Sequence, residues 1–145
     1  MKTPPSEMVG VAWLNALSGL DAPAATSLPS GTAWSATGFV VVEVVGTGHM
    51  PDVPSRVPIF RCHAWALASG SSNAPYSHAS GIAGIIWSAA MDGLALGPLV
   101  IKPGFARALV QSTWPVSELQ RIPDPDASRA HYVVDIGLRW VPLPD

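Results

Sequence analysis

Cys62 and His63 are neighbours in the chain, and a thiol beside an imidazole is the combination that a nucleophile and its general base require. Cys62 is also the only cysteine among the 145 residues. Both lie in the stretch PIFRCHAWALASG, Pro58–Gly70, in which the pattern predicts a β-strand from about Val57 to Leu67. The first question is whether a strand allows the two side chains to meet.

Strand geometry separates these two side chains. Successive residues of a strand point to opposite faces, so Cys62 shares a face with Phe60 and Ala64, while His63 shares the other face with Arg61. A nucleophile and its base need about 2.6–3.2 Å between their heteroatoms. We therefore expect Cys62 to be a small buried side chain and expect no catalytic pair here.

Other residue patterns do not predict a metal ion or a cofactor. The histidines at positions 49, 63, 78 and 131 lie in separate elements, without the short spacings of zinc ligands. His49 with Asp52 fits a solvated loop, and the carboxylates of Asp124–Ser128 (DPDAS) fit a turn. The small-residue loop Ala68–Ala74 could bind an anion at a helix N-terminus, but a linker with an N-cap is the simpler interpretation.

The composition indicates one globular domain that is poor in charge. A chain of 145 residues buries roughly 68–70% of its unfolded surface, so it can build a core. Charged residues make up 12%, against about 25% in an average domain, and the formal net charge is −2. The eight basic residues are scattered, which argues against a dedicated nucleic-acid-binding protein. Because so few charges cover the surface, we expect exposed apolar residues and a role in an assembly.

Two apolar segments do not predict a membrane anchor. Met8–Leu17, followed by the small residues Ala22–Ala24, loosely resembles a signal peptide, but Glu7 and Asn15 interrupt it and only one basic residue precedes it. The segment Ala79–Met91 has 13 residues, whereas roughly 20 are needed to span a bilayer. We expect neither a signal peptide nor membrane binding.

The first expected helix begins near Thr3, as N-cap, with Pro4 at the first helical position, and ends at Gly19. Its apolar residues recur at helical spacing on one face. They are Val9, Trp13, Ala16, Leu17 and Leu20. A loop rich in Pro, Ser, Thr, Ala and Gly follows over Asp21–Gly38.

A second helix is expected after an N-cap at Ser72 or Asn73, and it ends at Asp92-Gly93. Gly81 and Gly84 each weaken a helix by about 1 kcal/mol relative to alanine, so we expect them where the helix closely approaches the sheet or the first helix. The apolar face comprises Ala79, Ile82, Ala83, Ile86 and Ala90.

Four strands are expected, in two pairs. Phe39–Gly46 (FVVVEVVG) is apolar on both faces, so we expect cover on both sides or from a neighbouring subunit, and it forms a hairpin with the strand at 57–67. Ala106–Ile122 predicts a strand broken or bulged near Trp114-Pro115. His131–Val141 alternates between two faces. The sequence thus predicts a single α+β domain over residues 1–145, in two layers, with a mainly antiparallel four-stranded sheet and two helices packed on one face.

The order and the local sequences of these elements resemble a known family. The strand VPIFRCHAWA, the helix GSSNAPYSHASGIAGIIWSAAMDG and the closing strand SRAHYVVDIGLRW carry the resemblance, which spans Val9 to Val141. The chain resembles the tail terminator proteins of long-tailed (siphovirus-type) bacteriophages, particularly those of actinobacterial hosts. These shared segments are patterns of core packing and not catalytic signatures.

The resemblance implies a structural virion protein with no enzymatic activity and no cofactor. It implies a subunit of a homohexameric ring on the last ring of the tail tube, where it ends tube polymerisation and forms the surface that joins the head. Its implied partners are other copies of the chain, the tail tube protein and a head-completion or stopper protein of the neck. Genomic DNA would pass through the lumen without sequence readout. The implied location is the virion tail or neck, after assembly in the host cytoplasm.

A ring needs head-to-tail interfaces, which join two different surfaces of the subunit. We expect the hairpin tip Gly46–Arg56 and the segment Ser112–Arg121 to supply them, with Trp34 and Trp114 as aromatic anchors. The expected interface residues are Trp34, His49, Met50, Asp52, Arg56, Trp114, Glu118 and Arg121.

Other functions remain open at this point. The first alternative is another neck or tail-completion protein of the same virion. From other classes, the alternatives are a small ligand-binding domain with a pocket between helices and sheet, and a small hydrolase that uses Cys62 or His63.

Overall fold

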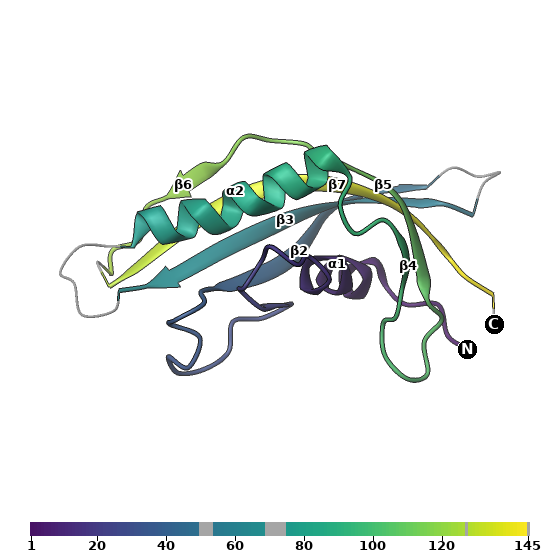
Figure 1. Cartoon of the computed structure of the whole chain (residues 1–145), viewed down its shortest axis with the longest axis horizontal. Helices are drawn as coiled ribbons and strands as arrows, with labels where there is room; N and C mark the ends of the chain where they lie inside the picture. The colour runs from purple at the N-terminus through teal and green to yellow at the C-terminus, as the bar shows by residue number, and fades with distance from the viewer. Residues whose placement is uncertain (50–53, 69–74, 127, 145) are drawn as a thin grey trace.

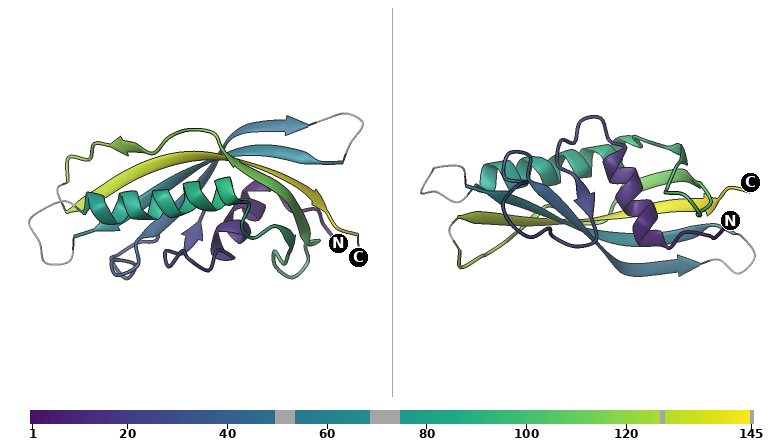
Figure 2. Two further views of the ribbon diagram at one scale, coloured as in Figure 1. Left: turned by 45° about the horizontal axis from the view of Figure 1, so that its top comes forward. Right: turned by 90° about the horizontal axis from the view of Figure 1, so that it is seen from below.

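The structure, a computed structural model, describes residues 1–49, 54–68, 75–126 and 128–144. It is an α+β domain in which two helices lie inside the curve of a strongly curled sheet (Figure 1, Figure 2). The elements in chain order are α1 (Ser6–Asn15), β1 (Ala24–Ala25), β2 (Phe39–His49), β3 (Arg56–Leu67), α2 (Tyr76–Asp92), β4 (Gly97–Leu99), β5 (Ala108–Pro115), β6 (Gln120–Ile122) and β7 (Arg129–Pro142).

The α+β class and the two helices are confirmed, but the four-stranded antiparallel sheet is wrong. Among the described residues the sheet has seven strands in the order β1-β2-β3-β7-β5-β4, with β6 also paired to β7. It is mixed, because β1 runs parallel to β2. The strands β1 and β4 have two and three residues, which is too short for the apolar periodicity from which strands are predicted.

The long strands β2, β3 and β7 form the centre of the sheet, with β3 between the other two. Along β3, Phe60, Cys62, Ala64 and Ala66 are fully buried beneath the helices, while the alternate residues are partly exposed on the opposite side, here called the open face. The prediction that this strand separates its residues in this way is confirmed. Val40 and Val42 of β2 extend the buried face, and both helices pack into the same core.

Helix α1 is shorter than predicted at both ends. It begins at Ser6 after Pro5, not at Pro4 after Thr3, and ends at Asn15, well before Gly19. The Asn15 side chain holds the end of the helix against β1, because its Oδ1 accepts a hydrogen bond from the backbone N–H of Ala24 (2.9 Å) and its Nδ2 donates to the Ala24 carbonyl (3.2 Å). Of the predicted apolar stripe, Val9 and Trp13 are buried within α1 and Leu17 is buried just beyond its end, whereas Ala16 is exposed.

Helix α2 buries the predicted face of Ala79, Ile82, Ala83, Ile86 and Ala90 and ends as predicted at Asp92, before Gly93 in the left-handed conformation (φ 64°). The N-cap is Pro75, and the predicted caps Ser72 and Asn73 lie outside the described residues. The expected close packing at the helical glycines is wrong. A Cβ at Gly81 would meet nothing within 4 Å, and one at Gly84 would touch only Leu119 at 3.9 Å.

The predicted break near Trp114-Pro115 is confirmed, because β5 and β6 pair with successive parts of β7. In the connection between them, the backbone N–H groups of Val116 and Ser117 both donate to the Asp135 carbonyl, at 2.8 and 3.2 Å. Because two successive N–H groups bond to one carbonyl, the regular ladder is interrupted here, but the chain stays hydrogen-bonded to β7. No helix among the described residues is long and apolar enough to cross a bilayer.

Candidate assembly interface

Cys62 and His63 lie on opposite faces of β3 and do not form a pair. Cys62 is fully buried in the core, where burial, and to a lesser extent the charge of Asp135, raise the pKa of its thiol to about 12. A thiol in this position is protonated at neutral pH and shielded from solvent, so it cannot act as a nucleophile. His63 points to the open face, where its contacts are with other residues.

The open face carries charged and aromatic side chains in rows across three strands. The register places Glu43, Arg61 and Asp135 side by side on β2, β3 and β7, and it places Trp65 opposite His131. Arg61 donates from Nε and Nη2 to the two carboxylate oxygens of Asp135, at 3.0 and 3.1 Å. Oppositely charged neighbours on one face stabilise the pairing of strands.

His63 connects these rows. Its Nε2 lies 2.9 Å from Oε2 of Glu43, and its Nδ1 lies 2.9 Å from Nε2 of His131. The ring of His131 stacks on Trp65, with 3.9 Å between centroids and 13° between planes. Burial, together with the neighbouring His63, lowers the pKa of His131 to about 4, and Asp124 partly opposes this shift. The open face is therefore tied together by its own side chains.

Exposed apolar side chains gather in the segment that leaves α2 and enters β4. Met91, Leu94, Leu96 and Val100, here called the 91–100 band, are between 47% and 77% exposed. The band is held in place because Trp13 Nε1 of α1 donates to the Leu94 carbonyl at 2.9 Å. Such a group of large exposed apolar residues is typical of a contact surface.

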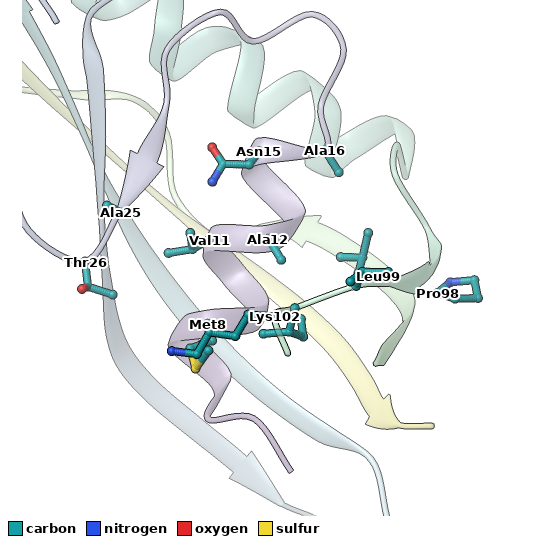
Figure 3. A pocket seen from close by; sticks show the side chains of 12 residues that line it. Met8, Val11, Ala12, Asn15, Ala16, Ala25, Thr26, Pro98, Leu99 and Lys102 are labelled. Carbon is teal, nitrogen blue, oxygen red and sulfur yellow. The ribbon is translucent and has the colours of Figure 1, made fainter. Parts of the chain in front are cut away.

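Beside this band, a groove of about 600 Å³ runs along the outer side of α1. Figure 3 shows α1 between two segments that are far apart in the sequence, Ala25–Thr26 and Pro98–Lys102. The walls are mainly apolar, with Met8 and Val11 from α1 and Leu99 from β4. Within the described part of the chain, Lys102 is the only charged lining residue. The groove and the 91–100 band share Val100, so the two surfaces adjoin there.

Pro98 limits the ways in which a partner protein can bind to this surface. It lies in β4, which pairs with β5 on one side and has no other strand partner among the described residues. Proline has no backbone N–H, so the edge cannot form a regular ladder with an added strand. A partner here would bind through apolar side chains.

Most of the predicted interface residues that the structure describes contact side chains of their own chain. Trp34 is buried against Phe39 of its own chain, and Trp114 lies half-buried over Gly137. Glu118 is exposed between β5 and β6. The remaining described positions carry cations against rings of the same chain, Arg56 over Trp140 and Arg121 over Tyr76.

His49 is the last residue of β2, but the structure does not describe its side chain. Met50 and Asp52 lie outside the described residues. The 91–100 band and the α1 groove were missed by the sequence reasoning. The available signal was the apolar stretch MDGLALGPLV, in which large residues follow the end of a helix without helical or strand periodicity.

The carboxylates of the acidic turn bond to the backbone of the turn itself. Asp124 and Asp126 accept hydrogen bonds from the backbone N–H groups two residues further on, at 2.8 and 2.9 Å, which confirms a turn built from Asx-type bonds. In the ranges that the structure describes, no three His, Cys, Asp or Glu residues lie together as a metal ion would require.

Comparison with known proteins adds no relative to this picture, since no protein-family model and no curated protein matches the chain. The resemblance carried by the three quoted segments therefore stays an expectation about function.

Proposed function

We propose that the chain is a ring-forming subunit of a tail terminator, which ends the tail tube of a long-tailed bacteriophage and offers a surface to the neck. The observation that supports an assembly role is the 91–100 band beside the α1 groove. A chain with 12% charged residues exposes an apolar surface there, and this surface suits a protein partner. The resemblance of the strand and helix segments supports the particular assembly.

A closed ring needs a second, different surface on each subunit. The connection between β5 and β6 offers one, because Val116 is 48% exposed there and Glu118 lies nearby in the chain. In Figure 1 this connection runs along the top of the molecule, away from β4. We propose that the 91–100 band of one subunit meets this connection on the next.

The test is an assembly reaction with the tail tube protein encoded by the same phage genome. Tube protein is polymerised with and without the chain, and tube lengths and ends are measured by negative-stain electron microscopy. We expect shorter tubes, each with a ring at one end. Tubes of unchanged length and bare ends would refute the proposal, and binding to an isolated head-completion protein instead would favour another neck protein.

Two variants locate the interface. Val100→Lys places a charge at the most exposed residue of the band, which lies outside any strand, so its effect on folding should be small. Leu28→Lys makes the same kind of change at an exposed apolar residue of the loop before β2. We expect Val100→Lys to abolish capping and Leu28→Lys to leave it intact. Equal activity of both variants would show that the band is not the contact surface.

The groove also favours a second candidate, a small ligand-binding domain. Its volume of about 600 Å³ falls within the roughly 300–1,000 Å³ usual for ligand sites, and the cation Lys102 lies among mainly apolar walls. The fluorescent anion 8-anilinonaphthalene-1-sulfonate is a suitable probe. Saturable 1:1 binding that Lys102→Gln weakens would support this function, whereas binding that is weak and unaffected by Lys102→Gln would argue against it.

A further inference from the structure

A continuous line of side chains crosses the open face from β2 to β7. Glu43, His63 and His131 are joined by two contacts of 2.9 Å, and His131 stacks on Trp65. The register explains the contacts, because His63 lies one row away from Glu43 on one side and from His131 on the other, within diagonal reach on a sheet. When two imidazoles are in direct N···N contact, one nitrogen must donate the hydrogen bond and the other must accept it, so the protonation states of the two rings are coupled.

Only some protonation states of the two rings are compatible with both contacts. With both rings neutral, Nε2–H of His131 donates to Nδ1 of His63, and Nε2–H of His63 donates to Glu43. With one added proton, His63 donates from both nitrogens, to Glu43 and to Nε2 of His131. Both states keep both contacts. A further proton on Nε2 of His131 would place two N–H donors 2.9 Å apart with no acceptor between them.

We propose that His63 and His131 form an acid-operated latch: together they hold at most one added proton while the face is closed, and a second proton separates the rings and releases His131 from Trp65. The latch joins β2, β3 and β7 at neutral pH and loosens the open face in acid. It is independent of the proposed assembly function.

The charges around the pair are compatible with this behaviour. Glu43 faces His63 and can accept a hydrogen bond from its Nε2 in both protonation states. Asp124 acts on His131 but is itself paired with Arg129 (2.9 Å), whose guanidinium lies over the other aromatic partner, Trp65. In the adjacent row Arg61 and Asp135 pair with each other, and the neighbour on β6, Ile122, is uncharged. Burial also disfavours charge on His131 and keeps its pKa low, at about 4.

The first test follows the histidine ring protons of the full chain by NMR from pH 3.5 to 8. We expect His131 to titrate near pH 4 in the unaltered protein. His63→Gln removes the neighbouring charge, so it should raise the titration midpoint of His131 by at least half a pH unit, while the control His78→Gln on α2 should not move it. One-site titration of His131 near its ordinary value of 6.5, or a His131 midpoint unchanged by His63→Gln, would overturn the proposal.

The second test follows the release of Trp65 by near-ultraviolet circular dichroism and tryptophan fluorescence. We expect an acid transition near pH 4 that precedes loss of the far-ultraviolet signal. His131→Phe keeps an aromatic ring on Trp65 but cannot take a proton, so its transition should disappear. The same transition in His131→Phe, or none before unfolding in the unaltered protein, would refute a latch.

Discussion

Gly137→Ala should destabilise the protein through a single contact with Trp114. Gly137 lies inside β7, and a Cβ built there would fall within 2.5 Å of three atoms of the Trp114 indole. Ordinary van der Waals contact begins near 3.4 Å, so the ring must move away from the sheet. The glycine is required by the tryptophan that covers it, since a strand gains nothing else from glycine.

The magnitude follows from two opposing terms. An indole that leaves the sheet re-exposes about half of its roughly 200 Å², which at about 25 cal/mol per Å² costs about 2.5 kcal/mol. Alanine in place of glycine within a strand recovers about 0.5–1 kcal/mol of backbone entropy. We therefore expect Gly137→Ala to lower the free energy of unfolding by about 1.5–2 kcal/mol.

A double-mutant cycle measured by urea unfolding tests this reasoning. In a Trp114→Ala background the indole is gone, so Gly137→Ala should become stabilising by about 0.5–1 kcal/mol. Gly81→Ala is the matched control, because its Cβ meets open space on a helix and should stabilise by a similar amount. If Gly137→Ala costs the same in both backgrounds within about 0.5 kcal/mol, the explanation from Trp114 is wrong.

Three further predictions rest on single contacts. Asn15→Ala removes both hydrogen bonds to Ala24 and should cost about 1–2 kcal/mol in urea unfolding, and Asn15→Asp, which keeps only the acceptor, should fall between. Cys62 should react with 5,5′-dithiobis(2-nitrobenzoic acid) only after unfolding, so rapid reaction of the native protein would contradict its burial. Because the folded-state pKa of His131 is lowered from 6.5 to about 4, stability should be full above pH 6.5 and decline as the pH falls toward 4. At about 1.4 kcal/mol per pH unit, reduced by roughly half for solvent screening, His131→Phe should flatten this decline by about 1–2 kcal/mol in urea unfolding at several pH values.

Periodicity predicted the faces of the long strands, because it depends only on local geometry. The alternation along β3 placed Cys62 on the buried face and His63 on the other, and the structure agrees. Likewise the apolar spacing of α2 identified its buried side. Where elements are short, this signal disappears, so β1 and β4 were missed and the sheet was expected with four strands.

Contacts between strands could not be predicted in the same way. The alternation of both strands was predicted, but the contact between His63 and His131 requires β3 to lie directly against β7 in one register. No local sequence pattern indicates which strands are neighbours in the sheet or in which register they pair. The same holds for Gly137, where a glycine in a strand indicates a close approach but only the pairing of β5 with β7 identifies Trp114 as the group that approaches.

The two sides of the sheet bear on where a partner could bind. From the apolar run of β2, cover on both sides or from a neighbouring subunit was expected. The open face is instead bound together by its own ion pair, histidine contacts and aromatic stack. Residues already paired with each other gain less from a partner, because their contacts must be broken or desolvated first. The 91–100 band has no such internal competition at its exposed apolar side chains, and Pro98 excludes a regular added strand at β4. Association is therefore expected at the band and the α1 groove, while the open face responds to protons.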